Sequence, residues 1–571
     1  MQKENESKTQ GIMDIKRTSV ITIFSFLLLN NIYSQTSPAI IPFDMISTGD
    51  PVLEDIRFLS LASGQPFLSF SPPLSPEEIW LFIESINETT LSPPAMEAYN
   101  RIQERLNPQA NLSISKGLFT AFLNANSTVE ARVKFNSAIE QFPSNQAINP
   151  FISLPIRFFF SDTLQLYAEP SLTMRPNKYM LDTFDLNIPT DYFEYDETMP
   201  LKFFLAAGGD WWSFQIGRDR LFWGTGHTGS LTFSDNSQYF DFARLSLFSS
   251  VFKYSMIVNQ LPMTLSRELF HPDNEIISAW WDDPANRIRT IHRYYYLQRL
   301  DFTLFNRLSI GVMEGIMVGN SPLELRYLNP FRIFHSLFSW EDYDTWQPPP
   351  VYDDLKPGDM IGSIFSLEVN WNIIRNLSFY GQFVMNEFAE RGERQRNPNQ
   401  PPNGLGYLAG LQFSHSFFST WTSIFFLEFI YTDPYLNILS SPFGSFIQQN
   451  RYGQYYYLGY PRDTIALTLG ANFFRQNNLN LSGKFSWIAN GEHNKHGLIW
   501  NWERTPDAAR QTTSTGIAEN NLVLSLNAGW KPLSWLSLNT SLVGIVSHNN
   551  LHISGNNQVG GQTSFFAGFH Y

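Results

Sequence analysis

Phe214–Leu247 is the stretch of this sequence whose residue types could best carry out chemistry. Arg218, Asp219 and Arg220 place three charges in a row, and the ring of His227 can donate or accept hydrogen bonds. Such charges are costly on a surface that faces lipid, so in a membrane protein at least some point inward or lie at an interface. The stretch is not a phosphate-binding loop, because no Gly-Lys-Ser/Thr follows its glycines and no helix begins there. Four glycines permit sharp turns and close backbone approach in it: Gly217, Gly224, Gly226 and Gly229.

A second candidate for chemistry is Ser414-His415-Ser416, because a hydrolase needs a nucleophile beside a histidine base. The triplet lies inside an alternating segment, Leu411–Phe417, with no visible activating partner, so we expect a strand histidine. The chain has no cysteine, which excludes a thiolate metal site and a cysteine nucleophile. Its acidic clusters lack the spacing of a calcium loop. We therefore predict no enzymatic activity, no metal and no cofactor.

The composition indicates which elements position these residues. Aromatic residues make up 16% of the 571 residues and charged residues also 16%, whereas charged residues are usually about a quarter of a soluble chain. The mean hydropathy of −0.20 argues against a helical membrane protein and suits a barrel, whose apolar residues occupy alternate positions. The net charge of −13 argues against a nucleic-acid partner, which would need clustered Lys and Arg.

The last ten residues, Gln562–Tyr571, alternate between an apolar, aromatic face and a largely polar one. Period-two alternation marks a strand with two unlike faces. An apolar strand at the chain end suits a barrel in which the final strand pairs with the first and meets lipid. This strand resembles the assembly signature of bacterial outer-membrane proteins. We therefore expect outer-membrane lipid and the outer-membrane assembly machinery as partners.

The alternation runs through most of the chain from Asn111 onward, as in Leu377–Glu387 and Leu479–Trp487. Short turns alternate with long polar stretches, which is the pattern of outer-membrane barrels. We predict that residues 111–571 form an all-β transmembrane barrel, long enough for roughly sixteen to eighteen antiparallel strands. The long stretches, which would form outer loops, are Asn177–Pro200, His271–Arg289, Trp340–Asp359, Glu390–Asn403 and Glu492–Asn520.

The first 110 residues have a different pattern. Lys16 and Arg17 precede a short apolar run, Val20–Leu29, so we predict that residues 1–34 are an export signal peptide. Residues 35–110 are predicted to form a small helical module on the periplasmic side. Ser75-Pro76-Glu77-Glu78 is a helix-capping box within it, and apolar residues recur at helical spacing afterwards. An ordinary helical cap and a plug for the barrel are both compatible with this pattern.

Two groups of motif residues carry a family resemblance. The first group is Gly217, Arg218, Trp223, Gly224, Gly226, His227, Ser230, Ser234 and Asn236. The second group is Glu314, Arg326, Tyr327, Asn329 and Pro330. In this order the motifs resemble those of the Wzi-like outer-membrane proteins of capsule assembly. The sequence departs from the common pattern at Phe222, where many relatives have Trp, and at Asn386, where Asp is common.

The resemblance implies a barrel of about eighteen strands with a helical bundle on its periplasmic side. It also implies an integral outer-membrane protein that acts as a lectin and anchors exported surface polysaccharide. Two long stretches combine aromatic faces with planar hydrogen-bonding groups, as carbohydrate recognition requires. Their candidate ligand-binding residues are Trp280, Trp281, Asp282, Trp340, Asp342, Tyr343 and Trp346. The alternative for each is a membrane-interface aromatic residue beside a solvated acidic loop.

The charged motif residues also have two interpretations. We expect first a network of lumen salt bridges that closes the pore and stiffens the barrel, ahead of direct ligand contact. The residues concerned are Arg218, Asp219, Arg220, His227, Glu314 and Arg326. The alternative function is an outer-membrane porin or substrate-selective channel, whose pore these charges would line.

Overall fold

The protein is described from a computed structural model of residues 1–571. The residues that the structure describes are 43–107, 112–116, 118–136, 149–174, 184–189, 202–234, 239–264, 290–319, 321–334, 361–388, 402–417, 421–439, 443–449, 455–475, 478–494 and 511–571. The predicted signal peptide and most of the long polar stretches lie outside these residues.

Three helices precede the sheet, as predicted: α2 (Val52–Ser63), α3 (Pro76–Glu84) and α4 (Pro93–Leu106). The capping box forms at the start of α3, where the side chains of Ser75 and Glu78 each accept a hydrogen bond from the other's backbone N–H. α2 packs against α4, and Asp55 and Arg101 join the two helices through an ion pair of 2.5 Å. Among the residues that the structure describes, no helix is long and apolar enough to cross a membrane.

Short strands open the sheet: β1 (Leu112–Lys116), β2 (Phe119–Leu123), β3 (Asn126–Phe135), β4 (Ile152–Ser153), β5 (Ile156–Phe160), β6 (Leu164–Glu169), β7 (Ser171–Leu172) and β8 (Phe184–Leu186). Longer strands follow: β9 (Lys202–Gly209), β10 (Trp212–Asp219), β11 (Phe240–Phe248), β12 (Phe252–Gln260), β15 (Arg293–Leu304), β16 (Leu308–Gly319), β17 (Ile361–Ile374), β18 (Leu377–Glu387), β19 (Gly404–Phe417), β20 (Trp421–Thr432), β23 (Thr464–Arg475), β24 (Leu479–Asn490), β25 (Glu519–Leu533), β26 (Leu536–His548) and β27 (Gln558–His570).

Smaller elements lie in the connections. Two separate two-stranded sheets are formed by β13 (Met263–Thr264) with β14 (Thr290–Ile291), and by β21 (Ile447–Gln449) with β22 (Tyr455–Tyr457). The short 3-10 helices are η1 (Glu88–Thr90), η6 (Leu325–Leu328), η11 (Glu492–Asn494) and η14 (Asn550–His552).

The main sheet contains 23 strand elements, all antiparallel to their neighbours. β2 and β3, β4 and β5, and β6 and β7 are pairs of elements that follow one another after one or two residues. With each pair counted as one strand, and β1 and β8 set apart as short additions, about eighteen strands remain, in agreement with the predicted barrel.

The last strand lies between β26 and β3. The predicted partner was the first strand, but β1 pairs with β2 instead. The reason is that β2 and β3 belong to one extended stretch, so that β1 lies beside its first half and β27 beside its second half. The stretch formed by β2 and β3 is therefore paired along one edge by two different strands, β1 and β27.

Short turns connect strands at one end of the barrel, and long connections link them at the other. Only residues 210–211 separate β9 from β10, and only residues 375–376 separate β17 from β18. By contrast, residues 220–239 link β10 to β11, and residues 320–360 link β16 to β17. This is the pattern predicted from the sequence, and it identifies the end with short turns as the periplasmic one.

The two faces of the wall differ in the way that the alternation predicts. In β25, Leu522, Leu524 and Leu526 are exposed on the outer face, whereas Asn521 is fully buried on the inner face. Phe565 and Tyr571 are also exposed on the outer face at the end of the chain. An apolar outer face is what a wall that meets lipid requires.

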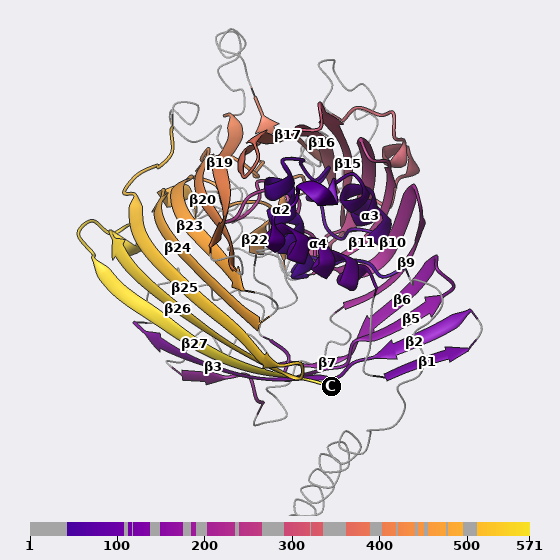
Figure 1. Cartoon of the computed structure of the whole chain (residues 1–571). Helices are drawn as coiled ribbons and strands as arrows, with labels where there is room; N and C mark the ends of the chain where they lie inside the picture. The colour runs from indigo at the N-terminus through magenta and orange to yellow at the C-terminus, as the bar shows by residue number, and fades with distance from the viewer. Residues whose placement is uncertain are drawn as a thin grey trace, which may run out of the picture.

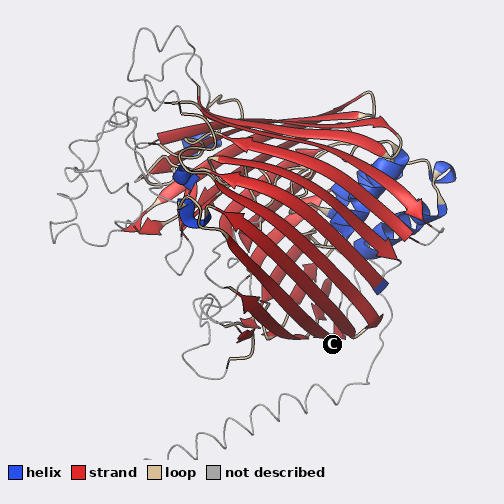
Figure 2. Ribbon diagram, turned by 90° about the vertical axis from the view of Figure 1, so that its left-hand side faces the viewer, coloured by secondary structure: helices blue, strands red, loops and turns tan. Residues whose placement is uncertain are grey.

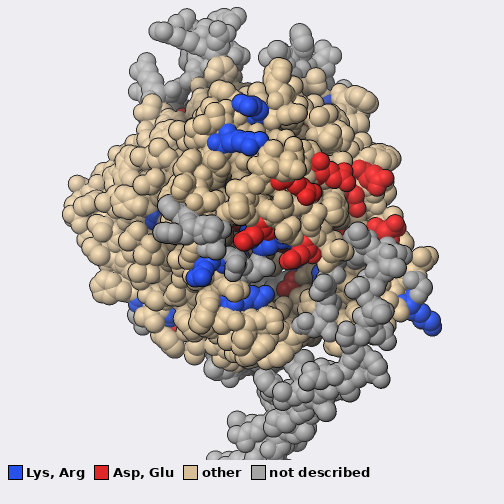
Figure 3. Space-filling model, in the orientation of Figure 1, with Lys and Arg blue, Asp and Glu red and all other residues tan. Residues whose placement is uncertain are grey.

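The helical module lies inside the wall of strands, at the end with the short turns (Figures 1 and 2). The carbonyl of Leu61, in α2, accepts from the backbone N–H of Asn376 in the β17–β18 turn at 2.7 Å. The carbonyl of Leu68 accepts from the hydroxyl of Ser309, near the β15–β16 turn, at 2.6 Å. Figure 3 shows Asp and Glu side chains gathered over the part of this face where the helices lie. The module therefore occupies the position of a plug.

Candidate functional site

The long connection after β10 folds back into the lumen and is called here the inner loop (residues 221–234). Its anchor is Trp223, which is fully buried and packs edge-on against Phe233 with 5.6 Å between ring centroids. The N–H of Trp223 donates to the carbonyl of Phe233, and the N–H of Gly224 donates to the carbonyl of Phe70 in the helical module. The inner loop is thus fixed to itself and to the plug.

One carboxylate of the wall holds the tip of the inner loop. Glu428 of β20 accepts from the backbone N–H of His227 at 2.7 Å and from that of Thr228 at 3.0 Å. It also accepts from the hydroxyl of Tyr380 at 2.9 Å. Lys484 of β24 donates to the carbonyl of His227 at 2.9 Å. These charge-assisted bonds connect two separate parts of the wall through one loop.

The ring of His227 is a packing element of this assembly. It stacks on Phe426 with 4.0 Å between centroids and 5° between planes. Its Nε2 lies 2.9 Å from Oε1 of Gln412 and 3.4 Å from the guanidinium of Arg57. Burial, and next the positive charge of Arg57, hold the pKa of His227 well below its usual value. The ring is therefore neutral at physiological pH, which suits a structural role better than proton transfer.

The motif glycines and serines are explained by close packing around the inner loop. A Cβ at Gly226 would collide with the carbonyl oxygen of Gly229, so a larger residue does not fit there. Ser230 and Ser234 are buried, and Gln382 of β18 accepts from the N–H of Leu231 at 2.7 Å. The sequence motif thus specifies a tightly packed internal structure.

Buried charges join the helical module to the wall. Arg299 and Asp301 of β15 pair at 2.7 Å, and Arg299 also contacts Glu368 of β17 at 3.2 Å. Ser69, which follows α2, donates to Asp301 at 2.9 Å. A second link is the pair between Lys253 of β12 and Glu78 of α3, whose side chains are 1% and 5% exposed. These ion pairs form a network in the lumen, but none of their residues is among the six that we expected to form it.

Three of the six residues predicted for a lumen network do lie in the lumen: Asp219, Arg220 and His227, which is described above. Asp219 accepts from the hydroxyl of Ser47 at 2.8 Å and lies 3.4 Å from Lys202. Arg220 borders the lumen cavity described below, and its carbonyl accepts from the hydroxyl of Thr48.

Arg218 requires a correction, because it lies on the outer face of the wall. Ser213 and Gln215 are buried on the inner face of β10, so the alternation places Ile216 and Arg218 outside. Arg218 pairs there with Asp241 of β11 at 2.6 Å, and both side chains are exposed. The motif glycine Gly217 precedes it with φ +136°, where a Cβ would meet the carbonyl of Phe203 on β9.

The second motif group also lies outside the lumen, which corrects its predicted position. Residues 321–334, called here the strap, follow β16 and fold over the outer face of the wall. Tyr327 and Phe334 of the strap form a buried cluster with Tyr296, Ile316 and Val318, which are outward residues of β15 and β16.

Polar contacts on the wall's outer face explain why the strap folds back. Glu314 accepts from the N–H of Phe334 at 2.9 Å, and Gln298 donates to the carbonyl of Asn329 at 2.9 Å. Glu314 and Gln298 are register partners on neighbouring strands. Lipid offers no hydrogen-bond partners, so the strap covers polar groups that would otherwise be exposed to it. Arg326 pairs with Glu324 inside the strap, and Pro330 follows Asn329 there.

A cavity of about 750 Å³ remains in the lumen between the helical module, the inner loop and the inner wall of β23–β26. Arg57, Arg220 and Lys484 place positive charges on its border, and Glu54 and Asp55 place negative ones. Uncharged amides and hydroxyls also line the cavity, and such groups can donate hydrogen bonds to sugar hydroxyls and accept hydrogen bonds from them. The uncharged polar side chains that the wall contributes are Asn472, Asn480, Ser482, Asn527, Ser537 and Asn539.

Several predicted site residues lie outside the described residues. These are the two candidate binding stretches, with Trp280, Trp281 and Asp282 in one and Trp340, Asp342, Tyr343 and Trp346 in the other, and also Asn236. Within the described ranges, no group of three His, Cys, Asp or Glu residues is arranged to hold a metal ion. His415 lies in β19, as expected of a strand histidine.

Sequence reasoning did not find Glu428, although it organises the inner loop. A signal was present: β20 is rich in apolar and aromatic residues, and Glu428 is its single charged residue. A buried carboxylate in such a strand needs partners, which indicates a structural or functional contact.

The fold, the apolar outer face and the filled lumen define a bacterial outer-membrane β-barrel with an internal plug. Residues 152–460, more than half of the chain, match the family model of the capsule assembly protein Wzi. The chain belongs to this family, and the protein is an integral protein of the bacterial outer membrane. A search among curated protein sequences finds no match.

One solved structure shows the same fold, and others are more distantly similar. Wzi of Escherichia coli, described as an outer-membrane protein involved in group 1 capsule assembly and a carbohydrate-binding β-barrel, matches with a TM-score of 0.51 and 13% identity, over 92% of this chain and 99% of that chain. OccD3 (OpdP) of Pseudomonas aeruginosa matches with a TM-score of 0.40 and 9% identity, over 81% of this chain and 93% of that chain. The match to Wzi of Escherichia coli, at 13% identity, shows the fold alone.

Proposed function

We propose that this protein binds exported surface polysaccharide at the outer membrane and anchors it there during capsule assembly. Membership of the Wzi family is the single observation that carries this proposal. The described structure agrees with it, because the plug, the inner loop and the buried ion pairs fill much of the lumen. A barrel that is filled in this way suits attachment better than free diffusion.

Two regions have the chemistry to contact a saccharide. The predicted outer stretches around Trp281 and Trp346 combine aromatic rings with carboxylates. Aromatic faces pack against sugar rings, and carboxylates accept from sugar hydroxyls. The lumen cavity offers amides on the wall, including Asn480 and Asn527, to a chain that enters from the periplasmic end.

The other partners follow from the same proposal. β27 is apolar on its outer face and pairs with both β26 and β3, so we expect the outer-membrane assembly machinery to recognise it.

The test is saturable binding of the cell's own purified surface polysaccharide by the detergent-solubilised protein. Trp281→Ala and Trp346→Ala should each weaken binding about tenfold, because aromatic anchors dominate such contacts. The matched control is Trp211→Ala, because Trp211 is 62% exposed in a short turn on the periplasmic side. Wild-type protein that does not bind the polysaccharide would contradict the proposal.

A second candidate function is a substrate-selective channel. The observation that favours it is the cavity of about 750 Å³, which lies beside the helical module and is bordered by charges. Ion conductance across a planar bilayer distinguishes the two functions, since a channel conducts steadily and a plugged barrel does not.

A further inference from the structure

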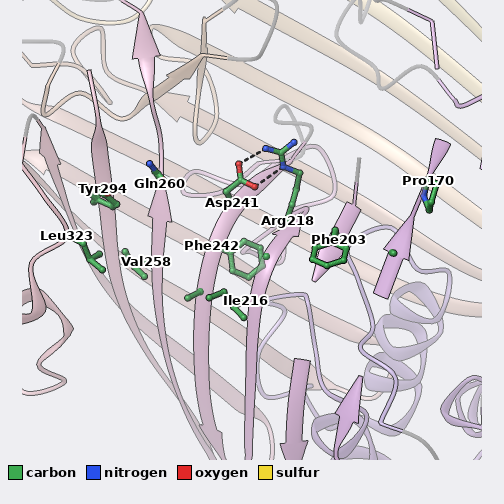
Figure 4. Close-up of a pocket in the computed structure, with 13 residues that line it drawn as sticks. Pro170, Phe203, Ile216, Arg218, Asp241, Phe242, Val258, Gln260, Tyr294 and Leu323 are labelled. Atoms are coloured by element: carbon green, nitrogen blue, oxygen red, sulfur yellow. Dashed lines mark hydrogen bonds and ion pairs between the residues drawn. The ribbon is translucent and has the colours of Figure 1, made fainter. Parts of the chain in front are cut away.

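Four polar side chains form one row across the outer face of the barrel. The row lies at the end of the barrel where long connections link the strands. Arg218 is the register partner of Asp241, Asp241 is that of Gln260, and Gln260 is that of Tyr294. The row therefore crosses β10, β11, β12 and β15 without interruption (Figure 4). Because long connections mark the outer side of the membrane, this row lies at the level of the outer leaflet.

The row immediately below it is apolar. Ile216, Ala243, Val258 and Tyr296 are register partners in the same order, two residues deeper along each strand. Ala243 is the smallest of them, so it leaves a depression between Ile216 and Val258. Together the two rows present a polar band directly above an apolar depression, which is the profile of a lipid headgroup above its chain.

This depression is part of a groove of about 770 Å³ on the outer face (Figure 4). Phe203 of β9 borders it on one side, and Leu323 of the strap borders it on the other. Leu325, Phe331 and Ile333 of the strap are 76%, 91% and 64% exposed. Side chains of this kind face lipid, so the groove is continuous with the surface of the barrel that lipid already covers.

The polar row offers both donors and acceptors at the mouth of the groove. Arg218 donates to Asp241 through Nε and Nη2, which leaves Nη1 for another acceptor. The Asp241 side chain is 52% exposed and can accept from a hydroxyl. The amide of Gln260 and the hydroxyl of Tyr294 can do both. A phosphorylated sugar needs such a mixture, whereas an isolated phosphate needs donors only.

We propose that this groove binds one lipid of the outer leaflet, a phosphorylated and acylated sugar of the lipid A type. An acyl chain lies over Ala243 between Ile216 and Val258. The sugar phosphate contacts Arg218, and the sugar hydroxyls contact Asp241 and Gln260. The strap forms one wall of the site, and its exposed apolar side chains enter the surrounding lipid. This site is separate from the polysaccharide site of the proposed function.

The test is native mass spectrometry of the full-length protein in mild detergent, titrated with purified lipid A and, separately, with phosphatidylglycerol. Ala243→Trp fills the groove, and Arg218→Gln removes the phosphate contact. Each should raise the apparent Kd for lipid A about tenfold, because each removes an acyl or a charged contact. Controls are Ala409→Trp, on an outward position of β19, and Arg307→Gln, in a short turn.

The lipid titrations have one result that supports the site and two that contradict it. Lipid A should bind more tightly than phosphatidylglycerol, and this binding should be weakened about tenfold in Ala243→Trp and unchanged in Ala409→Trp if the site exists. Equal binding of the two lipids, or equal binding by the two tryptophan variants, overturns it. Heat-modifiable electrophoretic mobility of each variant establishes that the barrel is folded. Polysaccharide binding should be unchanged in all four variants.

Discussion

Arg57 of α2 donates to the carbonyl of Thr225 at 2.7 Å, and this bond joins the helical plug to the inner loop. The guanidinium is buried and also lies over the ring of Phe70, with 5.0 Å to the centroid. Two segments that are distant in the sequence are therefore joined inside the lumen.

Arg57→Met should loosen this junction. A buried hydrogen bond from a charged donor contributes about 1.5–3 kcal/mol, so the free energy of unfolding should fall by about that amount. Urea unfolding of the reconstituted protein measures it. The matched control is Arg307→Gln, because Arg307 also donates to a backbone carbonyl but is exposed. Equal losses in the two variants would show that the junction contributes no more than a surface contact.

The buried pair between Lys253 and Glu78 should behave differently from an exposed one. Lys253→Met leaves a carboxylate buried and unpaired, and we expect a loss of about 3–5 kcal/mol. The double variant Lys253→Met with Glu78→Gln removes both charges, keeps an acceptor for the N–H of Ser75 and should recover most of that loss. Arg218→Gln, which breaks the exposed pair with Asp241, should cost at most about 1 kcal/mol. A double variant less stable than the single one would contradict the interpretation.

Glu77, at the start of α3, makes a pH-dependent contribution to stability. Burial raises the pKa of Glu77 from 4.5 to about 7 in the folded protein. The folded state therefore binds this proton more tightly than the unfolded state does, and stability falls as the pH rises from 4.5 to 7. The full effect is on the order of 3 kcal/mol.

Glu77→Gln should abolish this part of the pH dependence, because glutamine does not titrate. Urea unfolding between pH 4.5 and 8 measures the slope for the wild type and the variant. Glu84→Gln, at an exposed position of the same helix, is the control and should leave the slope unchanged. Parallel curves for wild type and Glu77→Gln would refute the assignment.

Glu428 should govern how firmly the inner loop closes the lumen. Glu428→Ala removes the acceptor for the N–H groups of His227 and Thr228 and for the hydroxyl of Tyr380. We expect the loop tip to detach and a steady planar-bilayer current, which the wild type should lack, to appear. Ser414→Ala, at a buried position of the neighbouring strand, should leave conductance at the wild-type level. Unchanged conductance in Glu428→Ala would show that the plug alone closes the lumen.

The sequence predicts the elements of this fold because they depend on local periodicity. The capping box at Ser75 and Glu78 lies within four residues, and the alternation of Leu522, Leu524 and Leu526 lies within five. Each pattern can be read from neighbouring residues alone, without knowledge of contacts to distant parts of the chain. The helices, the strands and the outward face of the last strand follow from signals of this kind.

The positions of Arg218 and Glu314 could not be predicted in the same way. A shift of one residue moves a strand side chain from the lumen to the outer face. A motif of mixed polar residues does not indicate which of these two faces each residue occupies. Glu314 is tolerable on the outer face because the strap, which comes later in the chain, covers it. The contact of Glu428 with the inner loop joins residues about two hundred positions apart and leaves no periodic signal.

The decisive measurement is the binding of purified surface polysaccharide to the purified protein, with planar-bilayer conductance recorded on the same preparation. If the barrel anchors polysaccharide and its lumen is closed by the plug and the inner loop, binding is saturable and no steady current flows. A steady current without polysaccharide binding would contradict this function, and the charges that border the lumen cavity would then be those of a selective channel.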